Sequence, residues 1–205
     1  MRRAIPFEKW HGLGNDYLLV ERSALDGALE PTLVRRLCDF HFGVGSDGLL
    51  EIVAEDGARA EIVIWNPDGS TAELSGNGTR IAARWLARRA GFDEVTIVVG
   101  AREVVARMRD EREVEMDMGP VEVAPTESLD VDGLALAFTP VSVGNPHAVI
   151  AREPDRIELL RLGPLVENHP RFPERTNVQL MRVDSRTETT AGVWERGAGE
   201  TLSSG

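Results

Sequence analysis

The sequence repeats itself at a nearly constant interval, and this repeat constrains the fold more than any single motif does. Landmarks of the first half return later: Gly14-Asn15 as Gly144-Asn145, Trp65 as Trp194, and Ser75-Gly76 as Ser204-Gly205. The interval is 130 positions for the first landmark (144 − 14) and 129 for the others (194 − 65 and 204 − 75). A shared interval predicts two structurally similar halves.

The repeat also predicts the domain organisation. We expect an N-terminal lobe over residues 1–128 and a C-terminal lobe over residues 129–205. In the first half, Ser75-Gly76 is followed by a helix and three strands, whereas the second half stops at Gly205. With equal copies, roughly 45 to 50 residues are missing from the second lobe. The sequence therefore predicts a truncated C-terminal lobe.

Hydrophobic periodicity predicts an α+β fold. Helical spacing of apolar residues, with Pro at one start and Gly at one end, indicates helices over residues 31–40 and 78–90. Strand-like segments bounded by turn residues cover 7–10, 17–21, 49–53, 60–65, 95–99, 103–108 and 114–118. The last three form a β-meander. This order favours mixed or antiparallel sheets over a doubly wound parallel fold.

Composition excludes several classes of function. The net charge of −11 argues against a nucleic-acid or anionic-membrane binder. A single cysteine, Cys38, excludes an intrachain disulfide and a Cys-rich zinc site, and the four histidines lack metal-ligand spacing. Pyridoxal phosphate chemistry would need the only lysine, Lys9. No apolar run suits a membrane helix or a signal peptide, so we expect a cytoplasmic protein.

The junction between a strand and a helix near Ser75 is the strongest candidate for ligand binding. Free backbone N–H groups and the helix dipole favour an anion at Gly76 and Asn77, and glycines allow its close approach. The simpler alternative is a tight turn with a helix cap. Ser204-Gly205 repeats the junction, which favours two such termini that bind one carboxylate ligand.

Polar residues at loop ends suggest a site for a zwitterion. Five asparagines lie near glycines or strand ends: Asn15, Asn66, Asn77, Asn145 and Asn177. Each alone reads as a turn residue, whereas together they offer the donors and acceptors that an amino acid needs. Glu195 and Arg196 could bind an ammonium and a carboxylate, or form an exposed ion pair. His147 also stands within the repeat.

Several motifs together resemble the diaminopimelate epimerase family. They cover residues 7–17, 43–48, 66–80, 144–147, 174–177 and 194–201. The resemblance implies a cytoplasmic, cofactor-independent enzyme that interconverts LL- and meso-diaminopimelate in lysine and peptidoglycan precursor synthesis. It also implies two pseudo-symmetric lobes, each with a sheet wrapped round a central helix, an active site between the lobes, and a homodimer.

The resemblance assigns roles to individual residues. The two catalytic cysteines of the family fall at Ser75 and Ser204, and His147 and Glu195 match groups that could tune their protonation. Substrate contacts fall at Asn15, Asn66, Asn145, Asn177, Glu195 and Arg196, and the carboxylate-binding helix starts fall at Gly76-Asn77 and Gly205. A contact that is often Gln in the family falls at Gly48.

The two serines predict weak or absent activity. A thiol titrates near pH 8.5, whereas a hydroxyl is a far weaker acid that a helix dipole shifts by only about one pKa unit. Cys38 lies in a predicted helix and reads as a core residue. Two alternatives therefore stay open: an isomerase or dehydratase of related fold that acts on another small acid, and a non-catalytic fragment.

Overall fold

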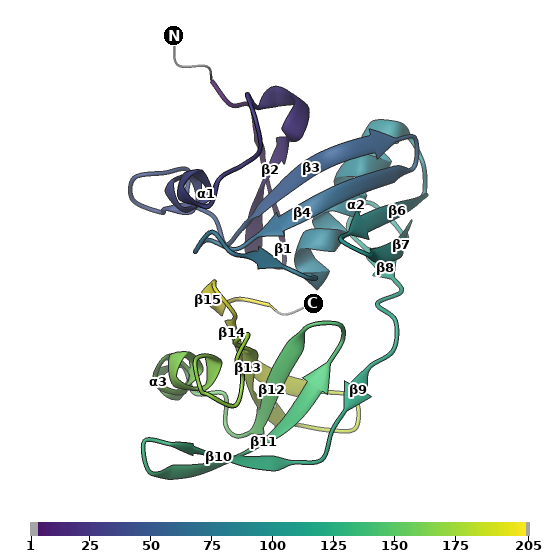
Figure 1. Cartoon of the computed structure of the whole chain (residues 1–205). Coiled ribbons are helices and arrows are strands. Elements are labelled where there is room, and N and C mark those ends of the chain that lie inside the picture. Colours follow the sequence, from purple (N-terminus) through teal and green to yellow (C-terminus); the bar gives the residue numbers. More distant parts are fainter. Residues whose placement is uncertain (1–3, 204–205) are drawn as a thin grey trace. The chain divides into compact units, whose positions relative to one another are not determined.

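The computed structural model describes residues 4–203, which form two compact units, and each is described by itself (Figure 1). Unit 1 ends at Met118 and unit 2 begins at Gly119. The repeat suggests a division after residue 128, ten residues later. The difference arises because the short strand β9 (Glu122–Val123) pairs with β11 (Leu134–Ser142) and so joins the second sheet.

Unit 1 is built on an eight-stranded mixed sheet in the order β1-β2-β3-β4-β6-β7-β8, with β5 paired to β4. Its strands are β1 (Glu8–Gly12), β2 (Asn15–Glu21), β3 (Leu49–Asp56), β4 (Arg59–Trp65), β5 (Thr71–Ala72), β6 (Glu94–Val99), β7 (Arg102–Met108) and β8 (Val114–Met116). The pairs β2–β3 and β4–β6 are parallel and the others are antiparallel. The sheet is therefore mixed, as the sequence suggests, and the expected β-meander is present.

The helix α2 (Gly76–Ala90) packs against one face of this sheet and contacts strands from β1 to β8, so the sheet wraps around it (Figure 1). Ser75 caps its N-terminus, and Gly91 ends it in the left-handed conformation that glycine adopts without strain (φ 75°). Ile81, Trp85 and Leu86 are buried in the resulting core. Helix burial of this kind stabilises α2 more than the intrinsic propensity of its glycine-rich start does.

A second, smaller core covers the other face of the sheet. The helix α1 (Pro31–Cys38) buries Val34 and Cys38 against Leu18 and Leu49, and a short 3-10 helix, η1 (Arg22–Ala24), lies earlier in the chain. Cys38 is a core residue, as expected, although it ends the helix rather than lying inside it.

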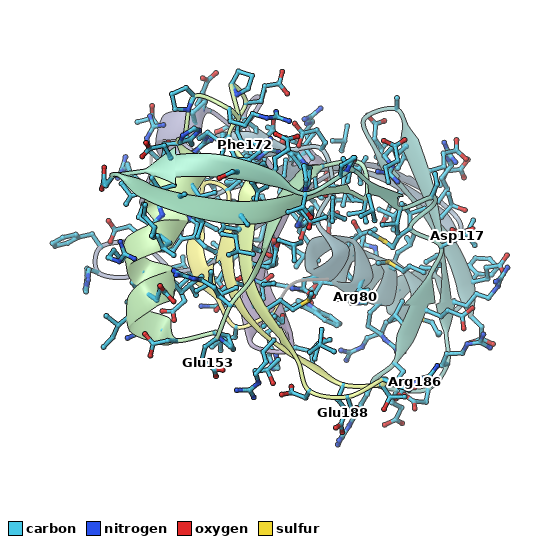
Figure 2. The ribbon with its side chains drawn as sticks, turned by 90° about the horizontal axis from the view of Figure 1, so that it is seen from below. Arg80, Asp117, Glu153, Phe172, Arg186 and Glu188 are labelled. Carbon is cyan, nitrogen blue, oxygen red and sulfur yellow. The ribbon has the colours of Figure 1, made fainter. Side chains whose placement is uncertain are left out.

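Unit 2 is built on a seven-stranded sheet in the order β10-β11-β12-β13-β14-β15, with β9 paired to β11. Besides β9 and β11, its strands are β10 (Glu127–Val131), β12 (Pro146–Ala151), β13 (Asn177–Val183), β14 (Thr189–Glu195) and β15 (Gly199–Thr201). Arg186 and Glu188 lie at the tip of the β13–β14 hairpin (Figure 2). The helix α3 (Arg156–Glu167) buries Leu159, Leu162 and Val166 against the sheet.

Strand registers inside each unit reproduce the sequence repeat. In unit 1, β3 pairs with parallel β2 and antiparallel β4, and Leu49 lies opposite Trp65. In unit 2, β13 pairs with parallel β12 and antiparallel β14, and Val178 lies opposite Trp194. Both members of the second pair lie 129 positions after their counterparts (178 − 49 and 194 − 65). The repeat is thus a repeat of strand topology, and the expectation of two similar α+β lobes is confirmed.

Candidate functional site

Ser75 is the N-cap of α2, and its hydroxyl has two close partners within unit 1. Its Oγ accepts a hydrogen bond from Gly78 N–H at 3.1 Å and lies 2.9 Å from Tyr17 Oη. Gly76, the first residue of the helix, is buried, and no residue that the structure describes accepts a hydrogen bond from its N–H. The junction therefore offers an unused backbone donor at the positive end of a helix.

Asn15 and Asn77 are brought together, as the zwitterion-site hypothesis requires. Asn77 Nδ2 donates to Asn15 Oδ1 at 3.1 Å, and Asn15 Nδ2 donates to Asp47 Oδ2 at 3.0 Å. Arg80, on the second turn of α2 (Figure 2), donates to Asn77 Oδ1. Burial lowers the pKa of Arg80 and raises the pKa of Asp47. This chain of hydrogen bonds fixes both amides beside the start of α2.

Asn66 closes the loop that precedes Ser75. Its backbone N–H donates to Ser70 O at 2.8 Å, and its Nδ2 donates to Ser70 Oγ at 3.0 Å. The turn interpretation thus accounts for the Nδ2 side of this amide, whereas none of the described residues 4–203 is seen to donate a hydrogen bond to its Oδ1. Asn66 is buried, so the carbonyl side of the amide is its remaining polar group for a ligand.

In unit 2, Asn177 and Arg196 lie side by side. Asn177 Oδ1 accepts from Arg196 N–H at 2.9 Å, and Asn177 Nδ2 donates to Pro146 O at 3.1 Å. The Arg196 side chain is buried and donates to Glu174 O at 3.1 Å. Arg196 is therefore a buried side chain and not a member of an exposed ion pair.

His147 links two amide side chains in the same unit. Its Nδ1 lies 3.0 Å from Gln179 Nε2, and its Nε2 lies 3.0 Å from Asn145 Oδ1. With the amides in these orientations, Gln179 donates to Nδ1, and the proton on Nε2 is donated to Asn145. Burial lowers the pKa of His147, and the charge of Arg196 adds to this effect. The imidazole is therefore neutral at pH 7.

The remaining predicted residues are only partly described. Glu195 is half-buried at the end of β14, where it pairs with Gly199. Ser204 and Gly205, the predicted second junction, lie outside the described residues. Their part in the site stays a prediction, as do the ligand contacts of the other predicted residues.

Two residues that contact the predicted site have only weak signals in the sequence. Tyr17 follows Asn15 by two positions on β2, and Gln179 follows Asn177 by two positions on β13. Residues two apart on a strand share a face. A search two positions beyond each asparagine along its strand would therefore have identified Tyr17 and Gln179.

The described residues include no cluster that could bind a metal ion, and the only lysine is already paired. Among residues 4–203, no group of three or more His, Cys, Asp or Glu side chains is placed to hold a metal ion. Lys9 Nζ donates to Gly45 O at 2.7 Å and pairs with Asp16 at 2.8 Å. An ammonium group held by a carboxylate is not a free amine for Schiff-base chemistry.

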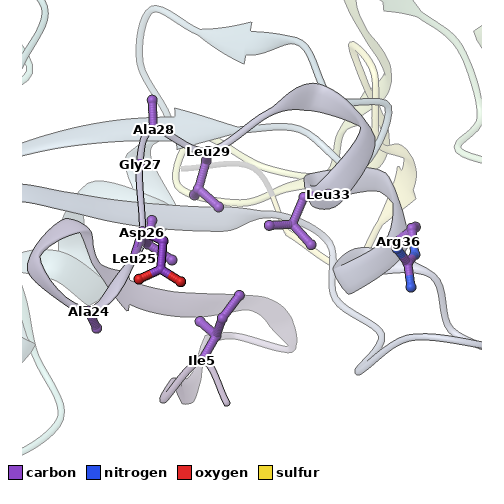
Figure 3. Close-up of a pocket in the computed structure, with 9 residues that line it drawn as sticks. All are labelled: Ile5, Ala24, Leu25, Asp26, Gly27, Ala28, Leu29, Leu33 and Arg36. Carbon is purple, nitrogen blue, oxygen red and sulfur yellow. The ribbon is translucent and has the colours of Figure 1, made fainter. Parts of the chain in front are cut away.

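A pocket of about 680 Å³ lies elsewhere in unit 1, where Leu25, Leu29 and Leu33 surround it together with Asp26 and Arg36 (Figure 3). None of the predicted site residues lines it.

Among the described residues no helix is long and apolar enough to cross a membrane.

The depressed pKa of His147 predicts a loss of stability in acid. The unfolded chain takes up a proton on this imidazole as the pH falls through about 6.5, whereas the folded chain does so only at lower pH. We therefore expect His147→Asn to weaken the decrease in unfolding free energy between pH 7 and pH 5. Denaturant titrations at each pH measure the unfolding free energy, and His41→Asn, at an exposed position, is the control. Equal slopes in native protein and His147→Asn would contradict the expectation.

Cys38 is expected to resist alkylation in the folded protein. Burial raises the pKa of its thiol to about 11, and the charges of Asp16 and Asp47 act in the same direction. The thiolate fraction at pH 8 is then about two orders of magnitude below that of a free thiol. Mass spectrometry after iodoacetamide treatment should find native chain unmodified and denatured chain alkylated. Similar rates in the two states would show that Cys38 is accessible.

The chain matches known proteins over nearly all of its length. The family model described as "Diaminopimelate epimerase" matches residues 7–124 and 139–205. The diaminopimelate epimerase of Pelotomaculum thermopropionicum is 38% identical, with 97% of this chain and 79% of the relative covered. The diaminopimelate epimerase of Methanothermobacter thermautotrophicus is also 38% identical, with 98% and 79% covered.

Solved structures with the same fold are more distant in sequence. A probable proline racemase from Agrobacterium radiobacter superposes with a TM-score of 0.74 at 15% identity, over 98% of this chain and 73% of the other. A hydroxyproline epimerase from Agrobacterium vitis gives a TM-score of 0.71 at 16% identity, over the same shares. These two establish the fold. The family model and the close relatives go further, and on their evidence the chain belongs to the diaminopimelate epimerase family, a family of amino-acid epimerases.

Proposed function

We propose that this chain binds diaminopimelate and interconverts its LL and meso forms by proton transfer at the α-carbon, without a cofactor. The named activity of the close relatives supports the substrate. The reaction would serve lysine and peptidoglycan precursor synthesis in the cytoplasm. The family resemblance is the support for that setting and for a homodimer.

One observation carries the proposal: the Ser75 junction combines a hydroxyl, an unused buried N–H at Gly76, and the fixed amides of Asn15 and Asn77. An amino-acid carboxylate needs N–H donors, and the start of a helix stabilises its negative charge. Ser75 then lies one residue from the bound carboxylate, and hence near the α-carbon.

The repeated topology supports an equivalent role for the second half. In this proposal Ser75 and Ser204 address opposite sides of the α-carbon, and Gly76-Asn77 and Gly205 bind its carboxylate. Asn66, Asn145, Asn177, Glu195 and Arg196 hold the rest of the substrate together with Asn15. His147 and Glu195 tune the protonation of the reacting groups. A neutral His147 suits that part, since it adds no charge that would compete with the substrate ammonium.

The serines make this a slow catalyst. Removal of an α-proton needs a base, and a hydroxyl at pH 7 provides almost no alkoxide even at a helix N-terminus. Lys9 does not offer an alternative route through an imine, because its ammonium is held by Asp16 and Gly45 O. The expected activity is therefore binding of substrate with slow exchange of the α-proton.

Two measurements on the native chain test the proposal. Calorimetry compares meso-diaminopimelate with lysine, which lacks the second carboxylate, and proton NMR in deuterated water follows loss of the α-proton signal. We expect selective binding of diaminopimelate and slow exchange. Asn77→Ala should weaken both, while Thr96→Val, on the distant strand β6, should change neither. Absence of both binding and exchange would contradict the function, and fast exchange at neutral pH would contradict the predicted weakness.

A further inference from the structure

We propose that Tyr17 and Ser75 act as a proton-relay pair, in which the phenol supplies and stores the proton that Ser75 exchanges with the substrate. The inference rests on the proposed function and names a second residue for the same reaction. In it, Tyr17 is a positioning residue that works through Ser75. The pair takes the place of a thiol on this side of the α-carbon.

The two hydroxyls come from the strand β2 and from the N-cap of the helix α2. Tyr17 lies on β2 and is 4% exposed, and its Oη is 2.9 Å from Ser75 Oγ, 58 positions away in the sequence. Ser75 also accepts from Gly78 N–H at 3.1 Å. A hydroxyl pair at this distance is a well-formed hydrogen bond.

The hydrogen-bond capacity of Ser75 decides its chemical role. A serine oxygen has two lone pairs and one proton. When Gly78 N–H and Tyr17 O–H both donate to it, the two lone pairs are occupied and its proton remains for a ligand. Ser75 then acts as an acid toward the substrate, and reversal of the Tyr17–Ser75 bond provides the base.

Gly48 provides the space that Tyr17 occupies. A Cβ atom at this position would lie 2.5 Å from Tyr17 Cε1 and 2.9 Å from Trp65 O. Because Trp65 O belongs to the backbone, the neighbour cannot simply move away. Any side chain at position 48 would therefore displace the tyrosine ring.

The relay balances without another reactant. As the substrate carbanion is protonated, Ser75 O–H breaks, a new C–H bond forms from the carbanion electron pair, and the Tyr17 proton passes to Ser75 Oγ. The negative charge moves from carbon to the phenolate. In the reverse direction the phenolate takes the Ser75 proton while Ser75 Oγ takes the proton from carbon. A phenol titrates near pH 10, about 1.5 pKa units above a thiol, so it holds this charge far better than serine does.

The first test measures exchange of the α-proton of diaminopimelate in the native chain, Tyr17→Phe, Ser75→Cys and the double variant. We expect the native rate to rise about tenfold per pH unit from pH 7 to pH 9, as the phenolate fraction rises. Tyr17→Phe should lower that rate by about a hundredfold and abolish the pH rise. In the Ser75→Cys background it should leave the rate nearly unchanged. Equal losses in the two backgrounds, or none in either, would overturn the relay.

The second test works without any turnover, which separates a failure of the relay from a failure of the proposed function. Tyr17 is the only tyrosine of the chain, so near-ultraviolet absorbance reports its ionisation directly. Ser75→Gly keeps an acceptable helix cap but removes the hydroxyl. Because a hydroxyl donates more strongly to a phenolate than it accepts from a phenol, we expect the variant to raise the tyrosine midpoint by about one pKa unit. Thr96→Val should leave the midpoint unchanged. A midpoint that Ser75→Gly does not move would overturn the pair even if the chain has no measurable activity.

Discussion

Replacing Ser75 and Ser204 together with cysteine is expected to raise the rate of α-proton exchange by about 10² to 10⁴ at pH 8. A thiol near pH 8.5, lowered further at a helix N-terminus, supplies a useful fraction of thiolate, whereas a serine hydroxyl supplies almost no alkoxide. Exchange of diaminopimelate protons in deuterated water, followed by NMR, measures the change.

The single variants and a displaced thiol provide the controls. Ser75→Cys alone should accelerate exchange at one side of the α-carbon and leave inversion limited by residue 204. Ser75→Cys combined with Ser203→Cys carries the same number of thiols, but one of them is a residue away from the predicted junction. It should behave like Ser75→Cys alone. A Ser75→Cys/Ser204→Cys protein that binds diaminopimelate but exchanges no faster than the native chain would refute the assigned roles.

Gly43→Ala is expected to destabilise the fold by about 3 kcal/mol or more. A Cβ atom there would lie 2.0 Å from Arg36 O and 2.7 Å from Leu37 O, and both are backbone atoms at the end of α1. The following residues satisfy the second of these carbonyls, since Val44 N–H donates to Leu37 O. Moving the loop therefore breaks the end of the helix. Chemical denaturation of the variant and the native protein measures the loss, against a total stability of about 5–15 kcal/mol.

Gly27→Ala is the matched control for this substitution. A Cβ atom at Gly27 has no neighbour within 4 Å, and its backbone conformation suits alanine. We expect no loss, or a gain of about 0.4–1 kcal/mol from the stiffer unfolded chain. Gly43→Ala should also weaken ligand binding, because the same loop leads to Asp47, which holds Asn15. Unfolding of both variants at the same denaturant concentration would show that the loop accommodates a side chain.

The start of α2 shows how far periodicity predicts an element. Apolar spacing indicates a helix from residue 78, whereas the helix begins at Gly76. Its first turn is glycine and asparagine, which have low helix propensity and give no periodic signal. The turn forms because Ser75 caps it and its residues are buried among neighbouring strands.

The sequence does not predict the helix α3, because part of its composition disfavours a helix. Gly163 and Pro164 stand next to each other inside it, and both disfavour a helix interior. Burial of Leu159, Leu162 and Val166 offsets that cost. Gly163 is also required by packing, since a Cβ atom there would lie 2.5 Å from the Trp194 ring. A contact 31 positions away in the sequence thus explains the residue that obscures the helix.

The sequence alone determined the two-fold repeat, the α+β class, and the positions of Asn15, Ser75, Asn145 and His147 at loop and strand ends. These features depend on local propensity and on a shared interval, which are properties of the chain itself. Only the tertiary structure decided which side chains meet: Tyr17 with Ser75, and Gln179 with His147. Such pairs depend on strand register and helix packing between distant segments, and a shift of one residue in either would place a different side chain at the contact.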